Sequence, residues 1–516
     1  MSGGAQARRE RSFELVALVG LLAVAALARF VGLPARGMWD ADQGHDMLVL
    51  LSFVRDGTVP LLGPSTSSGA FHHGALYYYL LAPAAALSDA DPGAVVAAIA
   101  AAGVGAVLAT WWLARSIAGP VAGLVAGSLM AISASAIGES TFIWNPNLIP
   151  LSSALTLAAA WRAWSSGRMR WYVAAAAAQA VTMQCHVLGA VLLVPLALIL
   201  VADARRRPPG ARAKVLRAAL AGLLVIAASY IPLLIHELGS GFSETRSALA
   251  FLAAGGDPSA LPLLVRLPVI ALRILSWPLT GLVTDEPVAA LLVAAAIVSI
   301  LVWRGLRATG PERPAVRWLA LTLAWSALVL AIVAANLATV VPGLPNDHYH
   351  AFLDPIVFVL AALGAAALWR SGRPWRVAAA ATIAVVAVFN VAIWPPAISP
   401  DGGWPAAQAA AARIVATLGG REPGLAGLPA FKSTDALGFP LSRAGQPPLP
   451  LLLQDPLAFA SVPIVLSCDR LFESVIGAAC GGPAEDIWAA RWTPGSVLRD
   501  RFDASPRTSI SIYVPR

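Results

Sequence analysis

Long runs without a charged residue constrain the fold of this chain more than any other feature. They cover 92–114, 116–138, 140–161, 171–202, 218–235, 287–303, 318–346 and 377–400, and shorter apolar runs cover 15–28 and 355–369. A helix needs about 20 apolar residues to cross a bilayer. The run 171–202 is long enough for two short helices with a turn at Gln184-Cys185-His186. We therefore expect a polytopic α-helical membrane protein with about eleven spans.

The composition excludes a water-soluble globule. Hydrophobic residues make up 58% of the 516 positions, charged residues only 12%, and the mean hydropathy is +0.72. Soluble domains carry about 25% charged residues. The polar side chains of this chain are too few to cover a folded surface in water.

The distribution of charge predicts the orientation. With a cytoplasmic N-terminus, the inner connections hold 20 Lys and Arg against 4 acids, and the outer connections before residue 396 hold 6 against 14. This asymmetry is the positive-inside pattern. It accounts for the net charge of +8 without a nucleic-acid partner. We expect a multi-pass protein of the plasma or inner membrane, with 15–28 as a retained anchor and the C-terminus extracytoplasmic.

A cluster of Pro and Gly at 395–403 predicts a domain boundary. Residues 1–395 then form the membrane domain and 396–516 a small extracytoplasmic domain. A helical pattern at 405–418 and strand-like patterns at 461–466 and 508–514 favour an α/β fold for it. Cys468 and Cys480 both fall in this domain, where disulfides persist, so we expect them to be bridged.

Two outer loops, at about 32–91 and 236–285, are longer than connections usually are unless they have a function. Each contains an apolar stretch too interrupted to span a membrane, at 47–54 and 261–275. We interpret both stretches as helices that lie in the membrane interface.

The first outer loop begins with a cluster of acids. Asp40, Asp42 and Asp46 lie within seven residues together with His45. If 42–54 is helical, Asp42 and Asp46 share one face at a spacing of four residues. Single acids at a span end are usually only solvated, but three acids with a histidine at the membrane surface favour a functional site.

All seven histidines fall in outer loops or at outer span ends under this topology. His72 and His73 precede Tyr77 in the first loop, and His186 lies at the predicted turn. Histidine can bind phosphate, coordinate a metal or carry a proton. The spacings fit no zinc signature, so the pattern indicates a site but does not identify a metal.

Two outer turns add further polar groups. Asn145 and Asn147 flank Pro146 in a segment that turn chemistry alone would also explain. Asp347, His348 and His350 precede a late span, and this denser cluster favours a function.

In these motifs the chain resembles the membrane glycosyltransferases of the GT-C fold. It is most similar to the branch of the dolichyl-phosphate-mannose protein mannosyltransferases and the bacterial lipid A aminoarabinose transferase, which is glycosyltransferase family 39-like. The resemblance covers most of 1–395 and rests on Asp40-Ala41-Asp42-Gln43, Gly57-Thr58-Val59-Pro60, His73-Gly74-Ala75-Leu76-Tyr77-Tyr78, Trp144-Asn145-Pro146-Asn147 and His348-Tyr349. The sequence departs from the family where Gln43 replaces a Glu and His73 replaces a Lys. These departures leave the donor sugar and any divalent metal open.

The resemblance implies an inverting sugar transfer from a polyprenyl-phosphate donor to a glycan, lipid or protein acceptor of the cell envelope. Asp42 would be the general base, with Asp40 as the second candidate. Cationic or N–H donors would stabilise the departing phosphate. The further candidates for substrate binding are Asp46, Arg55, His72, His73, Tyr77, Asn145, Asn147, His186, Arg246, Asp347, His348 and His350. The alternative is a transporter or lipid flippase, which would place ionisable residues along a pathway at mid-membrane depth.

Overall fold

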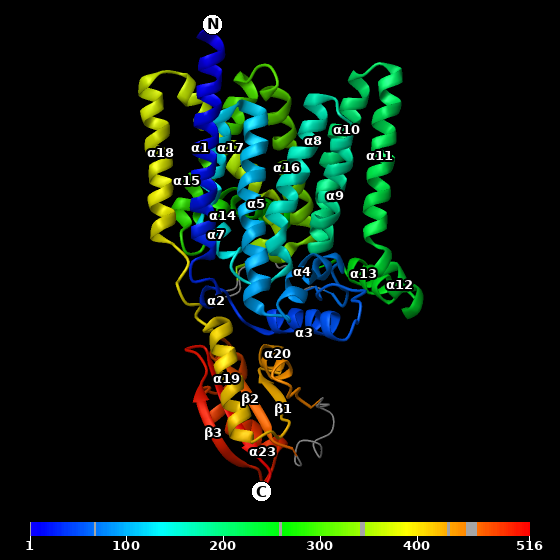
Figure 1. Ribbon diagram of the computed structural model, residues 1–516, viewed down its shortest axis with the longest axis vertical. Coiled ribbons are helices and arrows are strands. Elements are labelled where there is room, and N and C mark those ends of the chain that lie inside the picture. The colour runs from blue at the N-terminus through cyan, green and yellow to red at the C-terminus, as the bar shows by residue number, and fades with distance from the viewer. Residues whose placement is uncertain (1, 67–68, 257–260, 341–345, 431–433, 450–461) are drawn as a thin grey trace.

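The computed structural model describes residues 2–66, 69–256, 261–340, 346–430, 434–449 and 462–516. A helical bundle forms the N-terminal part, and a smaller domain with a sheet follows it at one end (Figure 1). We call this end of the bundle the domain end. The N-terminus lies at the opposite end.

The bundle contains α-helices and short 3-10 helices, the latter labelled η. The first half consists of α1 (Ser2–Phe30), α2 (Leu33–Arg36), α3 (Ala41–Arg55), α4 (Leu76–Leu87), α5 (Pro92–Ala118), α6 (Pro120–Ile132), α7 (Ala134–Gly138), η1 (Asn145–Leu148), α8 (Ile149–Ser166), α9 (Arg170–Cys185), η2 (Val187–Leu192) and α10 (Leu193–Arg206). The second half consists of α11 (Pro209–Ser229), α12 (Ile231–Ser240), α13 (Ser243–Ala253), α14 (Leu263–Thr280), α15 (Pro287–Arg307), α16 (Glu312–Val333), η3 (Ala335–Ala338), η4 (Asp347–Leu353), α17 (Asp354–Arg370) and α18 (Arg373–Ala392).

The structure confirms a multi-pass membrane protein. Within the described ranges, eight helices are long and apolar enough to cross a membrane, and the pair α11 and α12, bent by 50°, makes a ninth. Each of the eleven predicted segments contains a helix, but α6 and α9 have only 13 and 16 residues. The count of eleven spans therefore stays a prediction.

Helix α14 differs from the expected interfacial helix at 261–275. It has 18 residues and meets the length and hydropathy that a span requires. Its basic residue Arg273 is neutralised by Asp347, which explains how a charged segment can be buried in the bundle. Ser133 donates a hydrogen bond to the Pro278 carbonyl, so the end of α14 is held beside α7.

Helix α3 lies across the domain end, as the sequence predicts for its apolar stretch (Figure 1). It begins where Asp40 caps it: the Asp40 carboxylate accepts from the Ala41 amide at 2.8 Å, and the Gln43 side chain accepts from the Asp40 amide at 2.8 Å. The Asp40 side chain also accepts from the Gln43 backbone amide, and this reciprocal pairing of Asp40 and Gln43 is a capping box. Met47 and Leu50 anchor the helix in the core of the bundle.

The C-terminal domain is the predicted α/β domain. Its strands are β1 (Gly424–Leu428), β2 (Ile464–Asp469), β3 (Val497–Asp503) and β4 (Thr508–Val514), and its helices are α19 (Gly403–Leu418), α20 (Asp435–Arg443), η5 (Arg470–Phe472), α22 (Glu473–Ile476) and α23 (Pro483–Trp492). The sheet order is β1-β2-β4-β3; β1 pairs with β2 in parallel, and β4 pairs antiparallel with both β2 and β3. Cys468 and Cys480 form a disulfide.

Two hydrophobic clusters cover the two faces of this sheet. Val465 and Ile512 pack with Ile414 of α19 on one face, and Leu466 packs with Trp488 of α23 on the other. The predicted strand at 508–514 coincides with β4, and the predicted helix at 405–418 lies within α19. The predicted strand at 461–466 is shifted toward the C-terminus in β2, and its residue 461 lies outside the described residues.

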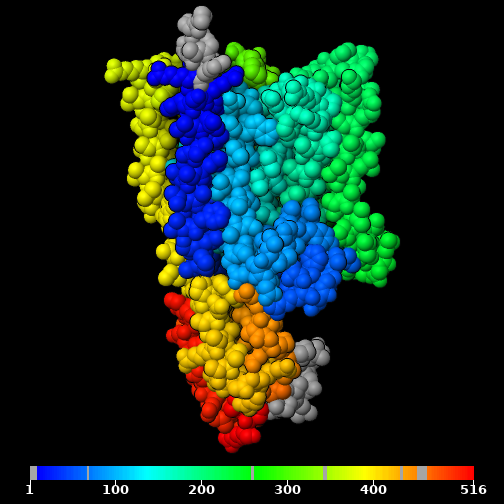
Figure 2. Space-filling view, in the orientation of Figure 1, coloured from blue at the N-terminus to red at the C-terminus, as the bar shows by residue number. Residues whose placement is uncertain are grey.

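The two domains are joined through an aromatic cluster. The ring of Trp39, just before α3, lies 4.6 Å from that of Trp404 and 5.7 Å from that of Phe439. The Trp39 indole donates to the Ala436 carbonyl at 2.9 Å. In the space-filling view the C-terminal domain forms a separate lobe against the first outer loop (Figure 2).

Candidate active site

A cavity of about 240 Å³ lies at the domain end of the bundle. It brings together residues from the first outer loop, from the turns that precede α8, η2 and α17, and from the C-terminal domain. Its lining consists of Ala41, Asp42, His45, Asp46, Pro64, Ser65, Thr66, His73, Trp144, Asn145, Pro146, His186, His348 and Asp435. Six of the predicted site residues therefore meet here: Asp42, Asp46, His73, Asn145, His186 and His348.

The geometry separates Asp42 from Asp40. Asp42 is exposed in the first turn of α3 and lines the cavity. The helix N-terminus stabilises a carboxylate at this position. Asp40 caps the helix and lines a different cavity of about 70 Å³ at the domain junction. Of the two candidate bases, only Asp42 faces the site where the histidines gather.

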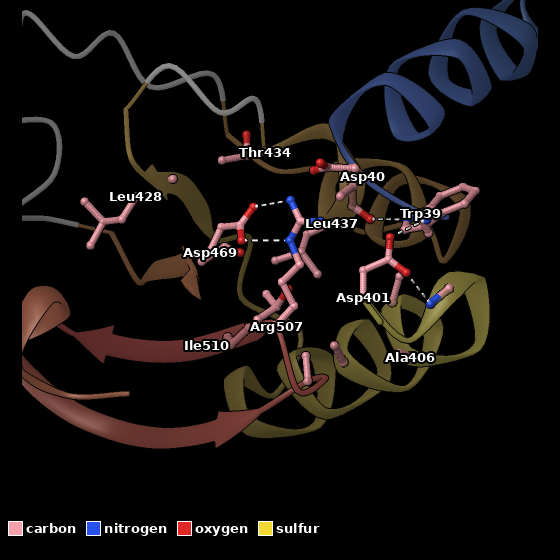
Figure 3. Close-up of a pocket in the computed structure, with 18 residues that line it drawn as sticks. Trp39, Asp40, Asp401, Ala406, Leu428, Thr434, Leu437, Asp469, Arg507 and Ile510 are labelled. Atoms are coloured by element: carbon pink, nitrogen blue, oxygen red, sulfur yellow. Dashed lines mark hydrogen bonds and ion pairs between the residues drawn. The ribbon is translucent and has the colours of Figure 1, made fainter. Parts of the chain in front are cut away.

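The cavity at the domain junction, which Asp40 lines, is bordered by a network of hydrogen bonds and ion pairs (Figure 3). Arg507 pairs with Asp469 at 3.0 and 3.2 Å, and Asp401 accepts from the Trp39 amide at 2.8 Å. The bond from the Trp39 amide to Asp401 ties the C-terminal domain to the start of α3, whereas the Arg507–Asp469 pair lies within that domain. Asp40 therefore belongs to the structural joint between the domains.

Asp46 lies one helical turn beyond Asp42 and is buried. Its two carboxylate oxygens accept hydrogen bonds from Tyr77 and Tyr78, each at 2.8 Å. Burial raises the pKa of Asp46 to about 7, although the two tyrosine hydroxyls act in the opposite direction. Asp46 and Tyr77 thus form a buried support beneath Asp42.

The other wall of the cavity is built from three histidines. The rings of His73 and His186 lie 4.7 Å apart, and those of His186 and His348 lie 5.9 Å apart. Trp144 contacts His348 with ring centroids 4.2 Å apart. The three histidines are each less than 10% exposed. The sequence places them in three different connections, and the fold joins them into one surface.

Backbone contacts fix the ring orientation of two of these histidines. The Val187 amide donates to Nδ1 of His73 at 3.4 Å, and the Leu188 amide donates to Nδ1 of His186 at 3.2 Å. A neutral imidazole that accepts at Nδ1 carries its hydrogen on Nε2. Burial holds the pKa of His73 well below its usual range, so this ring is neutral near pH 7. Each of the two rings therefore offers one N–H donor.

A residue from the second domain completes the lining. Nδ1 of His45 on α3 lies 3.0 Å from a carboxylate oxygen of Asp435 at the start of α20. The hydrogen bond to Asp435 raises the pKa of His45 above its usual value. No motif in the sequence indicates Asp435, because the two residues are 390 positions apart.

Asn145, Pro146 and Asn147 begin η1, directly after Trp144, and both asparagines are buried. Asn145 donates to the Cys185 carbonyl and so joins η1 to the segment that carries His186. Asn147 donates to the Phe142 carbonyl at 2.9 Å and does not line the cavity. Asn147 therefore only stabilises the turn, whereas Asn145 also lines the cavity.

The remaining candidates lie outside the cavity lining. His72 pairs with Glu244 at 3.1 Å, Arg55 forms an exposed ion pair with Asp89, and Arg246 is exposed on α13. Asp347 binds the buried Arg273, and His350 in turn lies 3.2 Å from Asp347. This last group holds α14 against η4, the segment that carries His348.

In the described part of the chain, no three His, Cys, Asp or Glu side chains converge closely enough to hold a metal ion. The possible divalent metal stays a prediction.

Comparisons with known proteins agree with this architecture. Residues 72–231 match the family described as dolichyl-phosphate-mannose-protein mannosyltransferase. The structure of ArnT from Cupriavidus metallidurans in the apo state is similar over 96% of this chain and 97% of its own, with a TM-score of 0.60 and 15% identity. The same protein bound to undecaprenyl phosphate gives a TM-score of 0.61 with the same identity and coverage. No curated protein matches the chain in sequence.

A third similar structure is the Archaeoglobus fulgidus oligosaccharyltransferase in complex with Zn and sulfate. The alignment covers 93% of this chain and 70% of the oligosaccharyltransferase chain, with a TM-score of 0.50 and 12% identity. Together these similarities confirm the GT-C fold that the sequence motifs predict for this chain.

Proposed function

We propose that this chain, which has the GT-C fold, is an inverting glycosyltransferase that moves a sugar from a polyprenyl-phosphate donor to an extracytoplasmic acceptor. One observation carries the proposal: an exposed carboxylate, Asp42, faces a wall of buried histidines across a single cavity at the end of a membrane bundle. The two sides of the cavity match the two halves of a sugar transfer, which are proton removal and phosphate departure.

Asp42 serves the first half. The acceptor hydroxyl attacks the anomeric carbon while its proton passes to the Asp42 carboxylate. The bond between the anomeric carbon and the phosphate oxygen breaks, and the phosphate keeps the electron pair. Attack from the side opposite the phosphate inverts the anomeric configuration.

The histidine wall serves the second half. Negative charge grows on the phosphate as the bond breaks, and Nε2–H donors from His73 and His186 can stabilise it. Because the donors are fixed by backbone contacts, they need no reorientation during the reaction. His73 takes the place that a Lys occupies in the resembling family.

The position of the cavity suits a lipid-linked donor. It lies at the domain end, where α3 and α4 meet the ends of the spanning helices, so a headgroup can enter it while the polyprenyl tail remains in the bilayer. The similarity of the fold to that of ArnT, which is solved bound to undecaprenyl phosphate, supports this donor class. The excess of Lys and Arg in the opposite connections supports an extracytoplasmic cavity.

The experiment is a transfer assay in membranes that contain the expressed chain. Undecaprenyl-phosphate sugars carrying a labelled hexose or pentose are added, and label is measured in the lipid, glycan and protein fractions. We expect label in one fraction with the anomeric configuration opposite to that of the donor. Retention of configuration, or no transfer from any donor above that of membranes lacking the chain, contradicts the proposal.

A further inference from the structure

The C-terminal domain contributes directly to the wall of the candidate active site. Its helix α20 lies against α3 (Figure 1). Asp435 at the start of α20 lines the same cavity as Asp42. The approach is close because α3 has a glycine at the crossing: a Cβ on Gly44 would lie 2.1 Å from the Asp435 carbonyl oxygen. The bundle and the domain are thus fitted together at the residue that precedes His45.

The contact between His45 and Asp435 fixes the chemistry of the imidazole. A carboxylate accepts hydrogen bonds, so the 3.0 Å contact requires the hydrogen on Nδ1 of His45. In the neutral ring the lone pair is then on Nε2, which makes Nε2 a proton acceptor. His73 and His186 have the opposite arrangement, with Nδ1 accepting and Nε2–H donating. The cavity therefore contains imidazoles of both kinds.

His45 is also well placed relative to the proposed base. Asp42 and His45 are three residues apart on α3, so they share a face of the helix. The side chain of His45 is 54% exposed, which gives a proton a route to solvent. Among the described residues, the titratable groups that act on His45 are Asp435 from α20 and Asp42 and Asp46 from its own helix.

We infer that Asp435 is a positioning residue of the active site and that it holds His45 as the group that takes the proton from Asp42. The inference rests on the proposed function. In the step, the acceptor hydroxyl loses its proton to Asp42, and the proton then passes to Nε2 of His45 and on to solvent. Asp42 is thereby returned to its carboxylate form, and no other reactant is needed.

The test compares Asp435→Asn with wild type in the transfer assay over pH 5 to 9. The amide can donate to Nδ1, which would move the hydrogen of His45 to Nε2 and remove the acceptor. We expect the maximal rate to fall at least about 10-fold, with little change in the KM for the donor. Neutral His45 is the active form, so the activity that still passes through His45 should have its acid limb at lower pH, because the carboxylate that raises the pKa of His45 is gone.

Asp500→Asn is the matched control, because Asp500 is an acid of the same domain that pairs with Arg413 away from the cavity. It should leave the rate and the pH profile unchanged. The double variant His45→Gln with Asp435→Asn should be no slower than His45→Gln alone. Either change alone already disables the His45–Asp435 pair, so the second change has nothing further to remove. If Asp435→Asn lowers the thermal unfolding temperature, the comparison of His45→Gln with wild type still decides the role of His45.

Wild-type rate and pH profile in both Asp435→Asn and His45→Gln would overturn this inference while leaving the proposed function intact. Absence of transfer by the wild-type chain would instead overturn the proposed function, and the inference with it. If the rate losses of the two single variants add up in the double variant, His45 and Asp435 act separately. That result would also contradict the inference.

Discussion

At the scale of single residues, two adjacent histidines allow a test of whether the histidine wall binds the donor phosphate. His73 lines the cavity and is buried, whereas His72 pairs with Glu244 outside it. His73→Ala should raise the KM for the lipid donor about 10-fold or more, because a hydrogen bond to a charged group contributes about 1.5–3 kcal/mol. His72→Ala should change the KM by less than about 2-fold. Equal effects of the two changes on donor KM would refute the assignment of the wall.

The pKa of His73 adds a pH expectation at the same scale. Burial lowers this pKa well below its usual value of 6.5, so the ring stays neutral from that pH upward. The contribution of His73 to donor binding should therefore be constant over that range. A difference in donor KM between wild type and His73→Ala that grows steeply below pH 7 would indicate a protonated ring and contradict this account.

At this scale the sequence predicts several residues that line the candidate site, but it does not distinguish between the two candidate bases. Asp42, His73, His186 and His348 were found because polar residues stand out at the ends of apolar runs. The choice between Asp40 and Asp42 depends on where α3 begins. The spacing of Asp40 and Gln43 is that of a capping box, and this signal was available in the sequence. Asp435 carried no comparable signal, since only tertiary packing brings it to His45.

At the scale of elements, the crossing of α3 and α20 determines whether the cavity is complete. Gly44→Ala would place a Cβ within 2.5 Å of three backbone atoms of α20. Because backbone cannot yield as a side chain can, the helices must separate, at a cost of about 1–3 kcal/mol. We expect a lower thermal unfolding temperature and a loss of transfer activity. Gly20→Ala in α1, where the new Cβ meets nothing within 4 Å, is the control and should change neither.

The element scale also shows what apolar periodicity predicts and what it does not. Strand β4 and helix α19 were predicted because their patterns are regular and their buried faces are apolar. Strand β1, with two glycines in five residues, and strand β3, with four charged residues and exposed positions, lack that pattern. Helix α14 was expected in the interface because Arg266, Pro268 and Arg273 interrupt it. The sequence did not show that Asp347 pairs with Arg273, and this pairing is what allows the charged segment to lie inside the bundle.

At the scale of the whole molecule, the protein is a membrane bundle with a cavity at one end and a second domain that lines part of that cavity. The apolar runs are sufficient to predict the membrane bundle, because the bilayer restricts the possible folds so strongly. The orientation that the distribution of Lys and Arg predicts stays a prediction. Neither pattern predicts how the two domains meet. That contact depends on Trp39, Trp404 and Gly44, which are individually unremarkable in the sequence.

The central claim is that Asp42 is the base of a sugar transfer, and the most direct measurement compares the rates of Asp42→Asn and Asp40→Asn in the transfer assay. Both changes remove one negative charge from the start of α3, and Asn caps a helix as well as Asp does. We predict that Asp42→Asn lowers the rate about 10²- to 10⁴-fold with donor binding retained, and that Asp40→Asn stays within a few-fold of wild type. Full activity of Asp42→Asn, in protein whose thermal unfolding is unchanged, would contradict the account.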